Sequence, residues 1–329
     1  MVKITFKNVG QGDSILLEWN HENEDKIAII DCNQHLSINP VLDYVKKMEY
    51  REIDFMILSH PHLDHFSGFV ELLQYCKKNN IKVRRFLHTA QTTPNYLKVA
   101  TRSIEENNKL YELFKLLDDL ADDGFLDVHP IDDNPDIKIK LGNEFTMEVL
   151  SPSSREIKKY INSENYPFDE ETISHPNVNW LCTLLKIYNE HLNVLLTSDV
   201  ESGALRRIGK KNSGRLAKGK IILAQIPHHG SKGNLDKTFW QMRRRFSKTP
   251  VVVSVGKNRY KHPSHEVLEF FNGQPNYELY RTDDSSLLLK SEETIKLSSL
   301  LDVVSQEIPE DLTSGDKTFK IFNTDIEII

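Results

Sequence analysis

Several features that would assign this protein to a class at once are scarce or missing in its sequence. The 329 residues include only three cysteines, Cys32, Cys76 and Cys182, which lie far apart in apolar surroundings. This spacing favours three core residues in a reducing compartment over a disulfide framework. No apolar run approaches the roughly 18 residues of a membrane span, and the first residues do not have the pattern of a signal peptide. We therefore expect a cytoplasmic protein with no membrane partner.

Linkers and internal repeats are missing as well. No stretch rich in glycine, serine or proline divides the chain, whose composition of 39% hydrophobic and 27% charged residues is typical of a globular protein. We predict one large domain over residues 1–299. Within it, residues 151–178 are expected to form an irregular insertion, and residues 300–329 form a C-terminal extension of unknown role.

What the sequence does contain is a compact cluster of metal-binding side chains. His60, His62, Asp64 and His65 fall within six positions, directly after the apolar run 53–58. Imidazole and carboxylate groups suit zinc, or manganese and iron where oxygen donors dominate. Four side chains so close in sequence cannot easily converge on one ion, so the cluster predicts two adjacent metal ions. Two such ions can clamp the attacking and the leaving oxygen of a hydrolytic displacement.

Three later apolar runs end in further candidate ligands. Residues 192–196 precede Asp199, residues 221–226 precede His228 and His229, and residues 251–255 lead through a short loop to His262. We expect these strand ends to face the same sheet edge as His60, although Asp199 alone could equally cap a helix. Periodicity further predicts strands over 2–6, 14–19, 26–31, 83–87, 144–150 and 179–188, and helices over 40–47, 66–78 and 103–120. Two strand-rich stretches, each followed by helices, predict two stacked sheets with helices outside.

With these motifs the chain resembles the metallo-β-lactamase superfamily. Residues 60–65 match its H-x-H-x-D-H signature, and Thr197-Ser198-Asp199 matches its bridging aspartate. The motifs at 9–14, 30–31, 58–62, 227–231 and 260–263 more closely resemble the branch found in the hydrolase domain of bacterial competence DNA-uptake channels and in phosphorylcholine esterases. The resemblance spans about residues 2–290 and implies an α/β fold, a four-layer αββα sandwich with mixed sheets and a dinuclear site at one sheet edge.

The resemblance also implies a role for each candidate residue. One divalent ion, zinc or alternatively manganese, would be held by His60, His62 and His229. The second would be held by Asp64, His65 and His262, with Asp199 between the two. Asp64 would orient the attacking water and His228 would donate a proton to the leaving oxygen, although the choice between His228 and His229 as ligand stays open. The residues expected to contact the substrate are Asp13, Lys232, Lys257, Asn258 and Tyr260.

The chain departs from the superfamily at one ligand. Where most members carry a histidine between the signature and the bridging aspartate, this sequence has Leu150-Ser151-Pro152. His229 and His262 are expected to complete the ligand count. His88 and His175 are alternatives, but each is better explained as a surface or pocket-wall residue.

The distribution of charge narrows the substrate class. Residues 206–261 carry sixteen lysines and arginines against one acid, Asp236, whereas the rest of the chain carries 26 basic and 47 acidic residues. Clustered cations near a catalytic centre favour a polyanionic substrate, unless these cations lie on solvated faces away from the site. The leading hypothesis is a dinuclear phosphodiesterase, probable nuclease, that uses a hydroxide activated by its metals. The alternatives are a hydrolase of a small phosphodiester, carboxylic ester or lactone, and a metal-stabilised binding or regulatory module without turnover.

Overall fold

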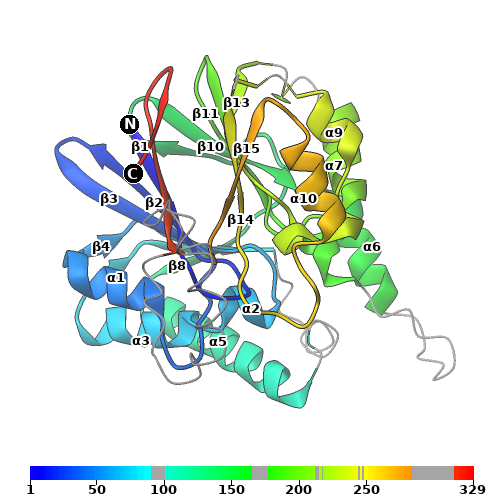
Figure 1. Cartoon of the computed structure of the whole chain (residues 1–329). Coiled ribbons are helices and arrows are strands. Elements are labelled where there is room, and N and C mark those ends of the chain that lie inside the picture. Colours follow the sequence, from blue (N-terminus) through cyan, green and yellow to red (C-terminus); the bar gives the residue numbers. More distant parts are fainter. Residues whose placement is uncertain are drawn as a thin grey trace, which may run out of the picture.

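The computed structural model of the chain describes residues 1–89, 101, 103–164, 177–211, 215–216, 218–243, 245–246, 248–283 and 315–329. Its strands form two large sheets that face each other, and helices cover the outer side of each sheet (Figure 1). The predicted four-layer αββα fold with mixed sheets is therefore confirmed. Among the helices in these ranges, none is both long enough and apolar enough to cross a membrane.

The first sheet has eight strands in the order β17-β16-β1-β2-β3-β5-β7-β8. Neighbouring strands are antiparallel from β17 to β3 and parallel from β3 to β8. The strands are β1 (Val2–Phe6), β2 (Ile15–His21), β3 (Glu24–Ile30), β5 (Phe55–Leu58), β7 (Arg85–His88), β8 (Asp127–Pro130), β16 (Lys317–Ile321) and β17 (Ile326–Ile328). A separate parallel pair is formed by β4 (Glu52–Ile53) and β6 (Lys82–Val83).

The second sheet has seven strands in the order β15-β14-β13-β12-β11-β10-β9. The strands from β9 to β12 are antiparallel and those from β12 to β15 are parallel. They are β9 (Lys138–Leu141), β10 (Phe145–Ser151), β11 (Leu184–Tyr188), β12 (Leu192–Leu196), β13 (Lys220–Gln225), β14 (Thr249–Val253) and β15 (Tyr277–Arg281). Because β12, β13 and β14 are parallel, their carboxyl ends lie at one edge of the sheet, where the chain can present functional side chains.

Three apolar clusters hold the layers together. One lies between the two sheets, one under the helices of the first sheet and one under those of the second sheet. The helices are α1 (Pro40–Met48), α2 (Leu63–Phe66), α3 (Phe69–Lys78), α5 (Ile104–Asp122), α6 (Ser154–Glu164), α7 (Ser202–Lys211), α9 (Lys237–Gln241) and α10 (His265–Asn272). The helix predicted from Pro40 is confirmed. It begins where Asn39 accepts a hydrogen bond from the Leu42 backbone N–H, and proline occupies the first turn.

Some predicted segments differ in the structure. The strand predicted from residue 179 is wrong in its first part, because Val178–Leu181 form a 3-10 turn (η1) and β11 begins only at Leu184. The irregular insertion is wrong over Ser154–Glu164, which form α6, while residues 165–176, His175 among them, lie outside the described residues. Of the C-terminal extension, residues 300–314 also lie outside them. Its remaining part supplies β16, which pairs with β1.

Candidate metal centre

The candidate site lies where the carboxyl ends of strands from both sheets meet. The end of β5 brings His60 there, the end of β12 brings Asp199, and the end of β13 brings His229. Hydrogen bonds join the two sheets at this point: Ser198 Oγ donates to Ser59 Oγ at 2.7 Å, and the Thr183 N–H donates to the Ser59 carbonyl oxygen at 3.1 Å. The convergence of distant segments that the sequence predicted is therefore present.

Asp199 lies at the centre of four imidazole rings and is only 1% exposed. Its Oδ2 atom lies 3.7 Å from Nε2 of His60 and 3.4 Å from Nε2 of His228. Its Oδ1 atom lies 3.6 Å from Nε2 of His65 and 3.7 Å from Nε2 of His229. The two carboxylate oxygens thus divide the histidines into two pairs.

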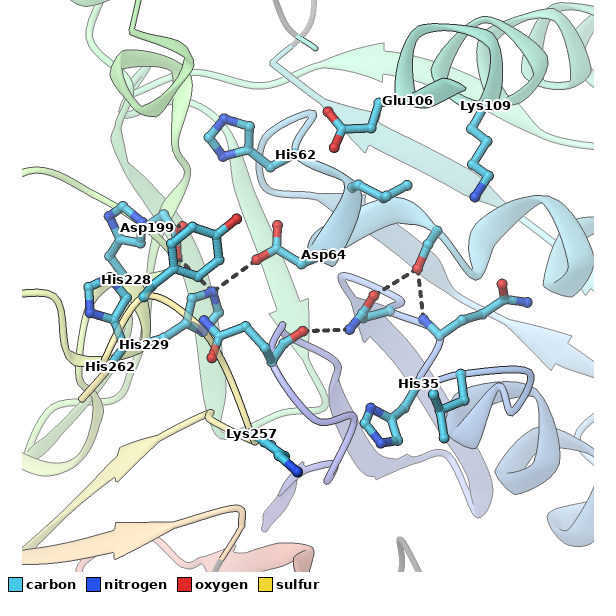
Figure 2. Close-up of a pocket in the computed structure, with 17 residues that line it drawn as sticks. His35, His62, Asp64, Glu106, Lys109, Asp199, His228, His229, Lys257 and His262 are labelled. Carbon is cyan, nitrogen blue, oxygen red and sulfur yellow. Dashed lines mark hydrogen bonds and ion pairs between the residues drawn. The ribbon is translucent and has the colours of Figure 1, made fainter. Parts of the chain in front are cut away.

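Each pair has a further partner from the 60–65 cluster. On the Oδ2 side, His62 Nδ1 lies 2.8 Å from His60 Nε2, and we call His60, His62 and His228 the nitrogen-rich half. On the Oδ1 side, Asp64 lies 3.4 Å from His229 Nε2 and 4.0 Å from His65 Nε2. We call Asp64, His65 and His229 the oxygen-rich half. In Figure 2, His228, His229 and His262 gather on one side of the cavity around Asp199, with Asp64 facing them.

Hydrogen bonds to the other ring nitrogens set the protonation of two histidines. His229 Nδ1 lies 2.8 Å from the carbonyl oxygen of Ser254, which can only accept, so this nitrogen carries the hydrogen. His65 Nδ1 donates in the same way to the Asp31 carboxylate at 2.7 Å. In the neutral rings the Nε2 atoms then carry no hydrogen and present a lone pair. A histidine in this form can bind a metal ion.

His228 is oriented by Asn234 in a similar way. The Asn234 amide nitrogen donates to the carbonyl oxygens of Asp199 at 3.2 Å and Val200 at 3.0 Å. Its Oδ1 atom must therefore be the atom 3.1 Å from His228 Nδ1, and it can only accept. The Nδ1 hydrogen of His228 consequently points at Asn234, which leaves Nε2 bare and facing Asp199.

These atoms fit a pair of bound metal ions. His65 Nε2, His229 Nε2 and Asp199 Oδ1 are buried and have no hydrogen-bond partner among the described residues. Lone pairs of nitrogen and oxygen that face each other in a buried site repel unless a cation lies between them. Within the described chain, His60, His65 and Asp199 form one group whose ligand atoms lie within 4.8 Å of one another, and Asp64, His65 and His229 form another.

The carboxylates also shift the titration of the histidines. Burial acts against a charge on His229, but Asp199 and the hydrogen bond to Asp64 outweigh it and raise the pKa of His229 to about 9. The pKa of His65 is likewise raised by Asp199 and Asp31 against the effect of burial. Metal binding must therefore displace protons from these rings, because a metal ligand has to be deprotonated.

Several residues of the candidate site have an unusual backbone conformation. His228 and His229 both have φ of 51°, Asp31 has 58° and Ser198 has 46°, all in the left-handed region that non-glycine residues rarely adopt. Such conformations are unfavourable by about 1–3 kcal/mol each and concentrate at functional sites. Two left-handed residues in succession turn His228 and His229 toward opposite oxygens of Asp199.

Comparison with known proteins supports the fold and the family. Residues 8–142 match the family model of the metallo-beta-lactamase superfamily. The match covers less than half of the chain and is to the same superfamily that the sequence motifs indicated. The superfamily inferred from the sequence is thus confirmed, whereas the narrower branch stays a prediction. No curated protein matches the sequence.

The solved structures that resemble the chain are distant in sequence. A mutant of the CmlA beta-hydroxylase is 14% identical with a TM-score of 0.43, covering 84% of this chain and 52% of that one. Zn(2+)-bound PqqB from Methylobacterium extorquens is 8% identical with a TM-score of 0.48, covering 85% and 98%. A long-form RNase Z from yeast is 12% identical with a TM-score of 0.39, covering 78% and 37%. This chain thus spans about half of CmlA, and we draw no conclusion about activity from these similarities.

A cavity of about 420 Å³ opens beside the metal centre. Its wall includes His62, Asp64, Asp199, His228, His229 and His262. Two lysines border it on opposite sides, Lys109 from α5 and Lys257 from the loop after β14 (Figure 2). The cavity is large enough for a small ligand.

Several predicted roles are wrong or need a different partner. His229 does not lie with His60 and His62 but in the oxygen-rich half, and His228 takes the place predicted for it. His262 does not join Asp64 and His65; it lies on the cavity wall beside His228, with ring centroids 5.8 Å apart. His88, an alternative ligand, packs against Phe114 outside the cavity wall.

The predicted substrate-binding residues fall into two groups. Lys257 and Tyr260 line the cavity, as expected for such a role. Asn258 instead bonds to the backbone of Gly256 and His262 and so shapes its own loop. Lys232 does not line the cavity; it is exposed and pairs with Glu266. Asp13 is buried and does not line the cavity either.

Sequence reasoning gave no role to the residues that orient the histidines. Asp31 accepts from the backbone N–H and Oγ of Ser59 as well as from His65, and Ser254 accepts from His229. Asp31 and Ser254 directly follow β3 and β14, so their positions at strand ends were a usable signal. Asn234 lies within a turn after the histidines, and nothing in its sequence context indicates its function.

Some of the cations in the basic segment 206–261 are paired with acids in the fold. Ion pairs join Arg206 to Asp236, Arg207 to Asp133 and Glu156, Arg215 to Glu148, and Lys232 and Lys237 to Glu266. Most of these acids come from outside the segment. Acids from other parts of the chain therefore offset part of the positive charge counted along the sequence.

Proposed function

We propose that the protein is a metal-dependent hydrolase that binds two divalent ions and cleaves a phosphodiester. The observation that carries this proposal is the arrangement of four imidazole Nε2 atoms, two at each oxygen of the buried Asp199 carboxylate. Two divalent ions in such a site supply an activated water and neutralise the charge that develops on an attacked ester.

The chain's own residues hold the ions and the water. His60, His62 and His228 would hold one ion and Asp64, His65 and His229 would hold the other, with Asp199 placed between the two groups. Asp64 reaches the cavity wall, so its carboxylate can orient the attacking water and accept its proton. His262 borders the same cavity and is placed to donate a proton to the leaving oxygen.

The loop of residues 256–263, which we call the rim loop, supports a phosphate ester as substrate. Lys257, Arg259 and Lys261 are exposed on it, and no ion pair to an acid is found for any of the three within the part of the chain that the structure describes. Lys257 reaches the cavity, and Lys109 lies across from it. Unpaired cations around a hydrolytic site attract an anionic ester and stabilise its transition state.

The test is hydrolysis by the purified protein loaded with zinc or manganese. We expect cleavage of bis(4-nitrophenyl) phosphate, abolished by Asp64→Ala and unaffected by His191→Ala, which changes an exposed histidine in the turn between β11 and β12. Cleavage of 4-nitrophenyl acetate or a lactone without phosphodiester cleavage would instead support the carboxylic-ester alternative. Two bound ions without turnover of any ester would support the binding module.

Variants of the rim loop can distinguish a small phosphodiester substrate from a nucleic-acid substrate. Lys257→Ala combined with Arg259→Ala should raise KM for any phosphodiester, with Lys46→Ala on α1 as the control. If nucleic acid is the substrate, the double variant should also reduce the dependence of KM on salt concentration, because fewer phosphate contacts release fewer counterions.

We further propose a cytoplasmic location, which the three buried free thiols support.

A further inference from the structure

A carboxylate without an assigned role lies behind the oxygen-rich half. Asp13 follows β1 in the loop before β2, is only 1% exposed and does not line the cavity. One of its oxygens, Oδ1, has no hydrogen-bond partner among the described residues. A buried carboxylate oxygen without a partner is strongly unfavourable, so its presence requires an explanation.

The backbone brings Asp13 into contact with the metal-binding cluster. The Asp13 N–H donates to the carbonyl oxygen of Asp64 at 3.0 Å. The preceding Gly12 has φ of +142°, and a Cβ atom there would collide with the Asn33 side chain and the Asp64 carbonyl oxygen. Glycine at this position is therefore necessary for the loop to pack so closely against Asp64.

Gln225 fixes the direction of the Asp13 side chain. Its Oε1 atom accepts from the backbone N–H groups of Thr197 and Ser198, both at 2.9 Å. Its amide nitrogen therefore faces Asp13 and donates to Oδ2 at 2.8 Å. With Oδ2 occupied in this way, Oδ1 is the oxygen that remains available.

The Asp13 carboxylate is within reach of a metal ion in the oxygen-rich half. One ligand atom each of Asp13, Asp199 and His229 lie within 4.8 Å of one another. Two donors on one ion, with bonds of about 2.0–2.2 Å, are separated by at most about 4.4 Å. Three donors that share one ion lie at most about 3.8 Å from one another on average, so an approach of about 1 Å or less brings all three atoms onto one ion.

We propose that Asp13 is a further ligand of the ion held by Asp64, His65 and His229, and that this ligand makes the oxygen-rich half selective for manganese over zinc. The inference rests on the proposed function, because it assumes that the centre binds metal. With Asp13 the half offers three carboxylates and two imidazoles. Zinc is satisfied by four ligands rich in nitrogen or sulfur, whereas manganese prefers more donors with a larger share of oxygen.

The first test compares the wild type with Asp13→Asn in titrations with manganese and with zinc. The asparagine carbonyl oxygen can still accept from Gln225, but an NH₂ group then faces the metal. We expect the affinity of the oxygen-rich half for manganese to fall about 100-fold, which is the size of effect seen when a group that supports a bound metal is removed. The affinity for zinc should change less than about tenfold. Asp25→Asn, at the exposed start of β3, is the matched control.

A second variant tests direct ligation without relying on a loss of binding. Asp13→Cys loaded with cobalt should show a thiolate-to-cobalt charge-transfer band that the cobalt-loaded wild type lacks. Absence of the band, or equal weakening of manganese and zinc binding in Asp13→Asn, would overturn the inference. A wild type that binds fewer than one ion per chain would overturn the proposed function itself, so the two failures are distinguishable.

Discussion

The two halves of the candidate metal centre share one carboxylate but differ in their other donors. The nitrogen-rich half has three imidazoles, whereas the oxygen-rich half has two imidazoles and Asp64, with Asp13 beside it. Asp199 presents one oxygen to each half, so the difference arises from the residues around it. A single bridging group can thus join two sites of unlike affinity, and the ions should bind in sequence rather than together.

The largest effect should come from removing one histidine of each half. His228→Ala should lose the ion of the nitrogen-rich half, and His229→Ala the ion of the oxygen-rich half. Each should lower kcat/KM about 100- to 1000-fold, because a main electrostatic contribution to the transition state is lost. Metal content per chain by mass spectrometry and steady-state kinetics would measure both effects.

His191→Ala is the control for these variants and should keep both ions. If His228→Ala kept two ions while His262→Ala lost one, the ligand set would be the one inferred from the sequence. The division into two halves would then be wrong.

A smaller effect, confined to the nitrogen-rich half, is expected for Asn234. Asn234→Ala removes the acceptor that keeps the hydrogen of His228 on Nδ1, so affinity for the ion of this half should fall about 10- to 100-fold. It also leaves the carbonyl oxygens of Asp199 and Val200 without a donor, which should lower the free energy of unfolding by about 1–3 kcal/mol.

Asn234→Asp separates these two effects. Aspartate can still accept from His228 but cannot donate to the carbonyl oxygens, so metal affinity should recover while stability stays low. Calorimetric titration and thermal unfolding would measure the two quantities. Equal metal affinity in Asn234→Ala and the wild type would show that Asn234 does not set the orientation of His228.

The smallest expected effect is a pH dependence of the oxygen-rich half. Because the pKa of His229 is raised to about 9, the stabilisation that its charge gives the metal-free protein is fully present below the unfolded pKa of about 6.5 and is lost as pH rises toward 9. Metal binding displaces this proton, so metal affinity should rise over the same interval, about tenfold per pH unit for each proton displaced. Thermal unfolding with and without manganese between pH 6 and 9 should therefore show opposite trends, and parallel trends would contradict this account.

The compact part of the site could be predicted from the sequence. His60, His62, Asp64 and His65 are close in sequence and follow a buried strand, so their proximity is almost independent of the rest of the fold. The strand ends before Asp199 and His229 were also identified, because apolar runs followed by polar residues are a local signal. The same local signals gave the two stacked sheets.

The pairing of ligands across the site could not be predicted in this way. Which oxygen of Asp199 a histidine faces depends on the left-handed backbone of His228 and His229, and histidine has no sequence signal for that conformation. The ion pairs of the basic segment could not be predicted for a similar reason, since Arg207 and Arg215 find their acids 51 to 74 and 67 positions away in the sequence. Both the pairing of ligands across the site and the ion pairs of the basic segment depend on interactions between segments that are far apart in the sequence.

The position of β16 has a consequence for where the chain can be shortened. β16 covers the outer edge of β1, and Lys7 and the Asn8 N–H bind Asp316 next to it. A protein cut at residue 299 would expose the backbone N–H and C=O groups along that edge. Exposed strand edges recruit strands from other molecules, so we expect such a fragment to aggregate even though every metal ligand is retained.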